Sequence, residues 1–99
     1  MIWSVYILYS EKDTRLYVGC ASDLGARLKA HNDGNVVSTR NRRPLVLIHS
    51  EEYKDRGDAF NRERFLKSLW GGRFKKKILG KYLGLNHPND DRPIFRAKP

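Results

Sequence analysis

The chain has 99 residues, in which 20 Lys and Arg outnumber 11 Asp and Glu to give a formal net charge of +9. The length fits one domain, and 39% hydrophobic content argues against an intrinsically disordered chain. The basic excess attracts polyanions, so nucleic acid is the expected partner and an acidic membrane surface the alternative. We expect no membrane role, because the apolar run 2–9 is too short to span a bilayer and neither terminus carries a lipidation signal. A single cysteine, Cys20, favours a reducing, cytoplasmic location.

The pattern of apolar and turn-forming residues predicts three strands and three helices. In chain order we expect a strand at 2–9, a turn at 10–14, a strand at 15–19, a helix from 22 or 23 to about 31, a loop at 35–44, a strand at 45–50, a helix from 58 to about 70 and a helix at 73–83. Ser22 or Asp23 can cap the first helix and Asp58 the second, which Gly71-Gly72 should end.

The order of these elements is β-β-α-β-α-α, which indicates a small α+β domain with a mainly antiparallel sheet covered by helices. We place this domain at residues 1–84. Residues 85–99 contain three of the four prolines and are expected to form a loosely held tail.

The second predicted helix carries a carboxylate among apolar residues. On a helical wheel, Ala59, Leu66 and Trp70 share one narrow arc, and Glu63 lies close to it. A carboxylate there is costly unless it is paired or binds a metal. Glu63 is therefore either a rim residue paired with an arginine such as Arg27 or Arg62, or an oxygen ligand for a divalent cation.

The first predicted helix and the hairpin offer further polar side chains. Leu24, Leu28 and His31 share one helical arc, with Arg27 on its flank. An exposed arginine beside a half-buried histidine is one interpretation, and a phosphate clamp with a neighbouring proton donor or acceptor is the other. Tyr6 and Tyr17 should approach each other across the hairpin as core aromatics, whose phenols need partners if buried.

Five segments carry a resemblance to a known family. Ser4-Val5-Tyr6 followed by Tyr17-Val18-Gly19 resembles the paired GIY and YIG motifs of the GIY-YIG nuclease superfamily. The segments 23–32, 38–44 and 59–63 resemble, in order, the family's helix with its Arg and His-Asn, its basic loop and the helix that carries its metal-binding Glu. The resemblance spans residues 3 to 79, and the most similar subgroup is that of small, stand-alone YhbQ-like bacterial proteins. Nucleases of excision repair and of DNA junctions share the module.

This resemblance implies a three-stranded antiparallel sheet flanked by helices and a metal-dependent endonuclease activity on nucleic acid, with DNA favoured over RNA. Carried over by position, Tyr6 or Tyr17 helps to activate the attacking water, and Arg27 stabilises the charge that develops at phosphorus. His31 assists proton transfer or holds a phosphate. Glu63 holds one divalent ion, Mg²⁺ or Mn²⁺. The metal and Arg27 should lower the tyrosine pKa from its usual value of about 10.

Two positions depart from the family pattern. Ser4 replaces the first Gly, which is tolerable if the backbone needs no positive φ there. Cys20 directly follows the second motif, where it is either a small buried residue or, less favoured, a catalytic thiol partnered by His31.

Three functions remain open at this point. The first is an active nuclease, and the second is a catalytically weak or inactive nucleic-acid-binding module of the same fold. The third is an interaction module whose protein partner supplies specificity. In the first two, the basic loop and the third helix would contact phosphates. The candidate phosphate-binding residues are Arg40, Arg42, Arg43, Lys75, Lys76 and Lys77.

Overall fold

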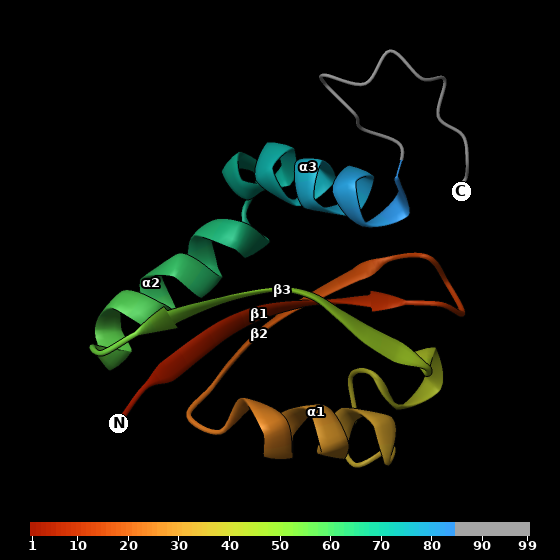
Figure 1. The fold of residues 1–99 in the computed structure, drawn as a ribbon, viewed down its shortest axis with the longest axis horizontal. Helices are drawn as coiled ribbons and strands as arrows, with labels where there is room; N and C mark the ends of the chain where they lie inside the picture. Colours follow the sequence, from red (N-terminus) through yellow and green to blue (C-terminus); the bar gives the residue numbers. More distant parts are fainter. Residues whose placement is uncertain (85–99) are drawn as a thin grey trace.

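The computed structural model describes residues 1–84, which form a three-stranded sheet with helices on both faces (Figure 1). The elements are β1 (Trp3–Ser10), β2 (Leu16–Ala21), α1 (Leu24–Asn32), the 3₁₀ turn η1 (Arg40–Arg42), β3 (Leu45–Tyr53), α2 (Arg56–Lys67), the 3₁₀ turn η2 (Leu69–Gly71) and α3 (Gly72–Leu83). The strand order is β2-β1-β3 and both pairings are antiparallel. The predicted α+β class is confirmed. The tail expected at 85–99 lies outside the described residues.

Side chains alternate along the central strand β1 and divide the core into two layers. Val5 and Ile7 face α2, where Val18, Ala59 and Leu66 complete a buried cluster. Tyr6 and Leu8 face α1 with Leu45. Figure 1 shows α1 on one side of the sheet and α2 with α3 on the other. Because β1 is covered on both faces, it is apolar almost throughout, as a two-sided central strand requires.

Helix α1 is fixed at both ends. Asp23 caps its start, with a side-chain oxygen that accepts from the Ala26 N–H at 3.0 Å. At its end, the Asn32 amide donates to the Leu45 carbonyl at 3.1 Å and accepts from the Leu45 N–H at 3.0 Å. These two bonds join α1 to the start of β3 and so hold the last turn of the helix against the sheet.

Helix α2 differs from its prediction at both ends. Its cap is Asp55 rather than Asp58, because the Asp55 carboxylate accepts from the Gly57 and Asp58 N–H groups at 2.6 and 3.3 Å. The helix ends at Lys67 because Ser68 adopts an extended backbone with ψ 171°, and the chain then forms η2. The expectation that Trp70 shares the core-facing arc is wrong, since Trp70 is 83% exposed.

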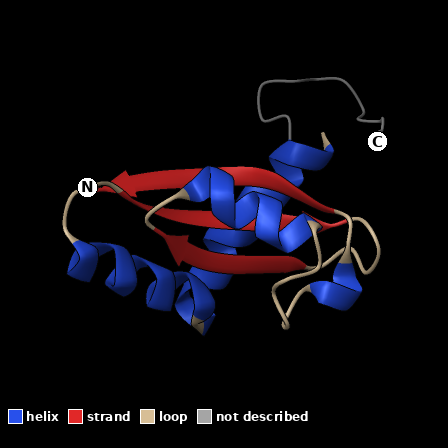
Figure 2. Cartoon of the chain, turned by 90° about the horizontal axis from the view of Figure 1, so that it is seen from below, coloured by secondary structure: helices blue, strands red, loops and turns tan. Residues whose placement is uncertain are grey.

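Strand β3 continues to Tyr53, beyond the Ser50 expected from the apolar run, because residues 51–53 still pair with β1. Figure 2 views the sheet from the α1 side and shows α2 emerging beside the β2 edge. Within residues 1–84, no helix is long and apolar enough to cross a membrane.

Candidate active site

A chain of hydrogen bonds lies buried between the sheet and α1. The Tyr6 hydroxyl is 2.9 Å from His31 Nε2, and His31 Nδ1 is 2.8 Å from Thr39 Oγ1. All three residues are fully buried. In a neutral imidazole one ring nitrogen donates and the other accepts. Either Tyr6 donates to Nε2 while Nδ1 donates to Thr39, or Nε2 donates to Tyr6 while Thr39 donates to Nδ1. The partner that a buried Tyr6 phenol requires is therefore His31.

The second tyrosine lies beside this pair, as the hairpin predicts. Tyr17 stands opposite Leu8 in the register, and its ring centroid is 6.4 Å from that of Tyr6 and 5.0 Å from that of His31. Tyr17 is only half-buried, so it separates the buried pair from the surface. The three rings form one aromatic cluster on the α1 face.

Gly19 makes room for the Tyr6 phenol. It pairs with Tyr6 in the register, and a Cβ atom at this position would lie 2.4 Å from the Tyr6 oxygen. A glycine is thus needed for close approach rather than for a left-handed backbone. Ser4 also has no positive φ, which explains why a residue other than Gly is accommodated there.

Arg27 extends from the exposed side of α1 towards the two phenols. A hydrogen bond with Tyr6 raises the pKa of Arg27, and the phenols of both tyrosines add to that effect. For Tyr6, burial raises the pKa of the phenol. The hydrogen bond and the positive charge of Arg27 lower this pKa, but by a smaller amount. Arg27 by itself therefore does not bring the Tyr6 pKa below its usual value, and the expected lowering by a metal together with Arg27 stays a prediction.

His31 is neutral at physiological pH. Its burial lowers the pKa of the imidazole, and the positive charge of Arg27 lowers it further. Both ring nitrogens already have partners. His31 thus holds the Tyr6 phenol in place as a neutral hydrogen-bonding group, and it is fully buried rather than half-buried as in the first of the two interpretations.

Glu63 lies on α2, which covers the opposite face of the sheet from the aromatic cluster. Burial is the main cause that raises the pKa of Tyr6 and that of Cys20, and the charge of Glu63 adds a smaller effect to each. Its carboxylate lies 2.9 Å from Lys67 Nζ and its side chain is 20% exposed. The expected arginine partners are wrong, because Arg62 instead binds Glu51 at 2.8 and 3.0 Å. Glu63 is a rim carboxylate with a lysine partner.

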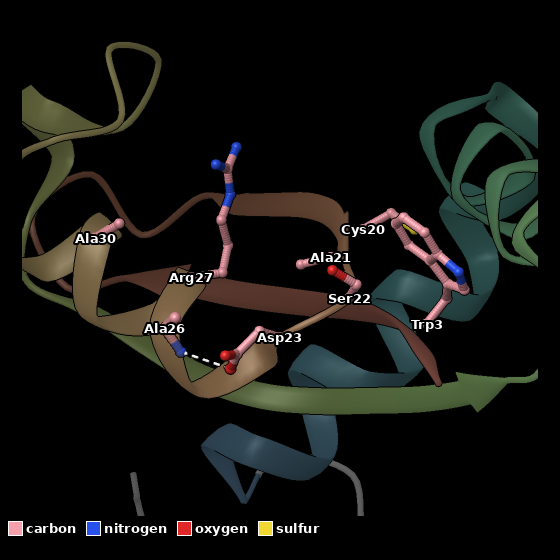
Figure 3. A pocket seen from close by; sticks show the side chains of 8 residues that line it. All are labelled: Trp3, Cys20, Ala21, Ser22, Asp23, Ala26, Arg27 and Ala30. Atoms are coloured by element: carbon pink, nitrogen blue, oxygen red, sulfur yellow. Dashed lines mark hydrogen bonds between the residues drawn. The ribbon is translucent and has the colours of Figure 1, made fainter. Parts of the chain in front are cut away.

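An open groove with a volume of about 460 Å³ runs beside Arg27. It is lined by Trp3, Cys20, Ala21, Ser22, Asp23, Ala26, Arg27 and Ala30. Figure 3 shows Arg27 rising from α1, with Trp3 and Cys20 close together at the other end. Burial raises the pKa of the Cys20 thiol, and both nitrogens of His31 are engaged elsewhere, so the pairing that a catalytic Cys20 would need is absent from the described residues.

The six basic candidates for phosphate contact are not equivalent. Arg40 and Arg43 are exposed, as are Lys76 and Lys77, while Lys75 is half-buried. Arg42 is held by Asp13, with Nε 2.6 Å and Nη2 3.3 Å from the carboxylate oxygens. Its guanidinium therefore joins the β1–β2 turn to η1, and only the other five side chains are available to a ligand in this conformation.

Sequence reasoning missed Thr39. It belongs to a polar loop whose residues are otherwise mostly exposed, and no local pattern marks it as buried. The only available signal was indirect, since a buried histidine needs partners on both nitrogens.

The sheet order and the paired tyrosine motifs are those of a GIY-YIG-type domain. The sequence matches the GIY-YIG catalytic domain family over residues 2–77, so the chain belongs to that family. It is similar to the UPF0213 protein CPE1444 of Clostridium perfringens, with 41% identity over 66% of this chain and 70% of that protein. It is also 39% identical to the UPF0213 protein YazA of Bacillus subtilis, over 59% of this chain and 60% of that protein.

A solved structure is similar as well. The solution NMR structure of the UPF0213 protein BH0048 from Bacillus halodurans covers 82% of this chain and 85% of its own, with 28% identity and a TM-score of 0.49. The UPF0213 names state no activity. Family membership supports a nuclease-type function and an interaction with nucleic acid.

Proposed function

We propose that this chain is a metal-dependent endonuclease that hydrolyses phosphodiester bonds in DNA. The observation that supports the proposal is Glu63, a carboxylate on α2 whose side chain is only 20% exposed, in a protein with a net charge of +9. A surface that only binds phosphate gains nothing from an added negative charge. A carboxylate there is useful when a cation lies between it and the phosphate.

A single protein carboxylate, Glu63, fits a Mg²⁺ or Mn²⁺ ion whose other ligands come mainly from the substrate. Among residues 1–84, no group of three or more His, Cys, Asp or Glu side chains is placed to hold a metal ion. Mg²⁺ commonly binds through one or two carboxylates together with phosphate oxygens and water, so a single Glu63 is sufficient. When bound, the ion would polarise the phosphoryl oxygen and support the leaving group.

The two tyrosines take different roles in this proposal. Tyr17 is half-buried and can contact a water at the surface, whereas Tyr6 is fully buried and bonded to His31. Tyr17 is therefore the phenol that accepts a hydrogen bond from the attacking water and orients it. Tyr6 and His31 are positioning residues, and the exposed guanidinium of Arg27 binds the phosphate oxygens as charge develops on them.

The decisive experiment is cleavage of a forked DNA by the purified chain with Mg²⁺, with Mn²⁺ and with EDTA. We expect cutting only with metal, and a loss of at least about 100-fold in rate for Glu63→Gln. The matched control is Glu52→Gln, an exposed carboxylate on β3, which should cut as the wild type does. Equal activity in EDTA, or in Glu63→Gln, would refute the proposal.

One observation favours a second function, a nucleic-acid-binding module with little catalysis. Lys67 lies 2.9 Å from the Glu63 carboxylate and would have to move for a metal to bind. This alternative would be established by a sample whose affinity for DNA falls steeply as the salt concentration rises, but which shows no metal-dependent cutting of forked, flapped, nicked or single-stranded DNA. Stable co-purification of another protein would add a partner for specificity. In a bacterial cell either function would place the chain with the DNA in the cytoplasm.

A further inference from the structure

A short apolar projection stands between α2 and α3. Helix α2 ends at Lys67, and the following 3₁₀ turn η2 exposes Leu69 to 97% and Trp70 to 83%. Phe65, 41% exposed, lies on the preceding helical turn. Two large side chains side by side in water are unusual for a small domain, because contiguous apolar surface normally serves a contact.

The projection is held by its backbone. Ser68 donates from Oγ and from N–H to the Phe65 carbonyl at 2.6 and 3.1 Å, and the Gly71 N–H donates to the Ser68 carbonyl at 3.1 Å. Gly71 is buried so tightly that a Cβ atom there would lie 2.4 Å from the Phe65 carbonyl oxygen. Leu69 and Trp70 are therefore presented outwards by a fixed turn, which lowers the entropy cost of a contact.

The positive charge around this turn indicates which kind of partner would bind there. Residues 64–84 contain seven Lys or Arg and no Asp or Glu. Along a single strand of nucleic acid, flat bases alternate with phosphates. An indole surrounded by cationic side chains can stack on a base while the cations bind the neighbouring phosphates, and proteins bind single strands in this way. In a closed duplex the base faces are already stacked, so they can accept an indole only at the cost of unstacking.

We propose that Leu69 and Trp70 stack on unpaired bases beside the cut site and direct the domain to single-stranded or branched nucleic acid. This rests on the proposed nuclease function, because Glu63 lies on α2, the helix that directly precedes η2. Lys67, at the end of α2, is four positions beyond Glu63, which is about 6 Å along the helix axis. A strand cut near Glu63 would therefore pass the projection within a few nucleotides.

Tryptophan fluorescence tests the contact directly. The chain has two tryptophans, so Trp3→Phe leaves Trp70 as the only source of tryptophan fluorescence. We titrate this variant with a single-stranded DNA, its blunt duplex and a fork that joins the two. Quenching by the single strand and the fork, but not by the duplex, supports the proposal. Equal quenching by all three, or none, overturns it.

Affinities separate stacking from charge. Trp70→Ala should weaken single-strand binding by about tenfold with an unchanged salt slope, and Trp70→Phe should restore most of it. Lys76→Ala should instead lower the slope by about one. The matched control is Val37→Ala, an apolar side chain 77% exposed in another loop, which should bind normally. Unchanged binding by Trp70→Ala overturns the proposal.

Other occupants of the surface give distinct results. Burial of Trp70 that rises with protein concentration alone would assign the surface to a second copy of the chain, and quenching by anionic vesicles in preference to DNA would assign it to a membrane. Either result overturns the proposal. If Trp70 stacks on DNA while metal-dependent cutting is absent, the stacking contact stands as a binding contact without a cut site, and the nuclease proposal fails. If Glu63→Gln abolishes cutting while Trp70→Ala binds and cuts normally, the reverse holds.

Discussion

The Tyr6 hydroxyl and His31 Nε2 lie 2.9 Å apart, and neither residue has any exposed surface. Thr39 completes the chain on the far side of the imidazole. A buried polar network of this kind is stabilising only while every member is satisfied. The same bond that orients Tyr6 at the candidate active site therefore also contributes to the stability of the domain.

Removal of one phenol oxygen should show this double role. In Tyr6→Phe, His31 Nε2 loses its partner in a site that water does not reach, so the free energy of unfolding should fall by about 1–3 kcal/mol. Tyr17→Phe removes the oxygen from a half-buried ring, so the unfolding free energy should change by less than about 1 kcal/mol while cleavage falls. Urea denaturation and cleavage rates measure the two effects. Equal destabilisation by the two variants would contradict the assignment.

Gly19 tests how closely the hairpin fits the first tyrosine. In Gly19→Ala, the new methyl would lie 2.4 Å from the Tyr6 oxygen and 2.5 Å from Cζ, so the ring must shift and the bond to His31 must lengthen. We expect a loss of about 1–3 kcal/mol in unfolding free energy. The control is Gly25→Ala, whose Cβ would approach no atom closer than 3.8 Å. Both changes act on the same contact. The double variant with Gly19→Ala and Tyr6→Phe should therefore lose less unfolding free energy than the sum of the losses in the two single variants, which a double-mutant cycle measures.

The sequence predicted those features that follow from local rules. Strand alternation and hairpin register are enough to bring Tyr6 and Tyr17 together, and the helical period places Arg27 and His31 on adjacent faces of α1. The Asp23 cap and the antiparallel sheet follow from equally local signals.

Long-range partners could not be read in this way. The bond between His31 and Thr39 depends on how the loop 35–44 folds back, and the pairing of Glu63 with Lys67 rather than an arginine depends on Glu51 taking Arg62. Trp70 was misplaced because an ideal helical wheel carries no information on where the helix ends. Ser68 ends α2 through its backbone conformation, and this turns Trp70 from the core to solvent.

The basic loop should separate into structural and binding arginines. Arg42→Ala leaves Asp13 without its partner and removes the bond to the Leu16 carbonyl, so it should lower stability, by about 1 kcal/mol because the pair is partly exposed. Arg40→Ala should leave stability unchanged and lower the salt slope of DNA binding by about one. Thermal unfolding and binding at several salt concentrations separate the effects. The interpretation is wrong if Arg42→Ala changes only binding.

Acid should destabilise the fold in two steps, and the first belongs to His31. Burial and the charge of Arg27 lower the pKa of His31 from its usual 6.5, so the folded state stays neutral where the unfolded chain takes up a proton. Stability is therefore complete above about pH 6.5 and falls as the pH drops towards the lower pKa of the folded state.

The second step belongs to Glu51. Burial acts to raise its pKa, but hydrogen bonds from Arg62, His49 and Tyr53 outweigh burial and lower the pKa to about 2. The unfolded carboxyl protonates near 4.5, so this stabilisation is present above about pH 4.5 and is lost between there and about pH 2. Glu51→Gln should reduce the lower step, to which Asp13 also contributes because Arg42 lowers its pKa, and should leave the step below pH 6.5 unchanged, in urea titrations from pH 7 to pH 3. Glu52→Gln, next to it on β3 but exposed, should retain both steps, and loss of the lower step in that control would assign it to general surface charge instead.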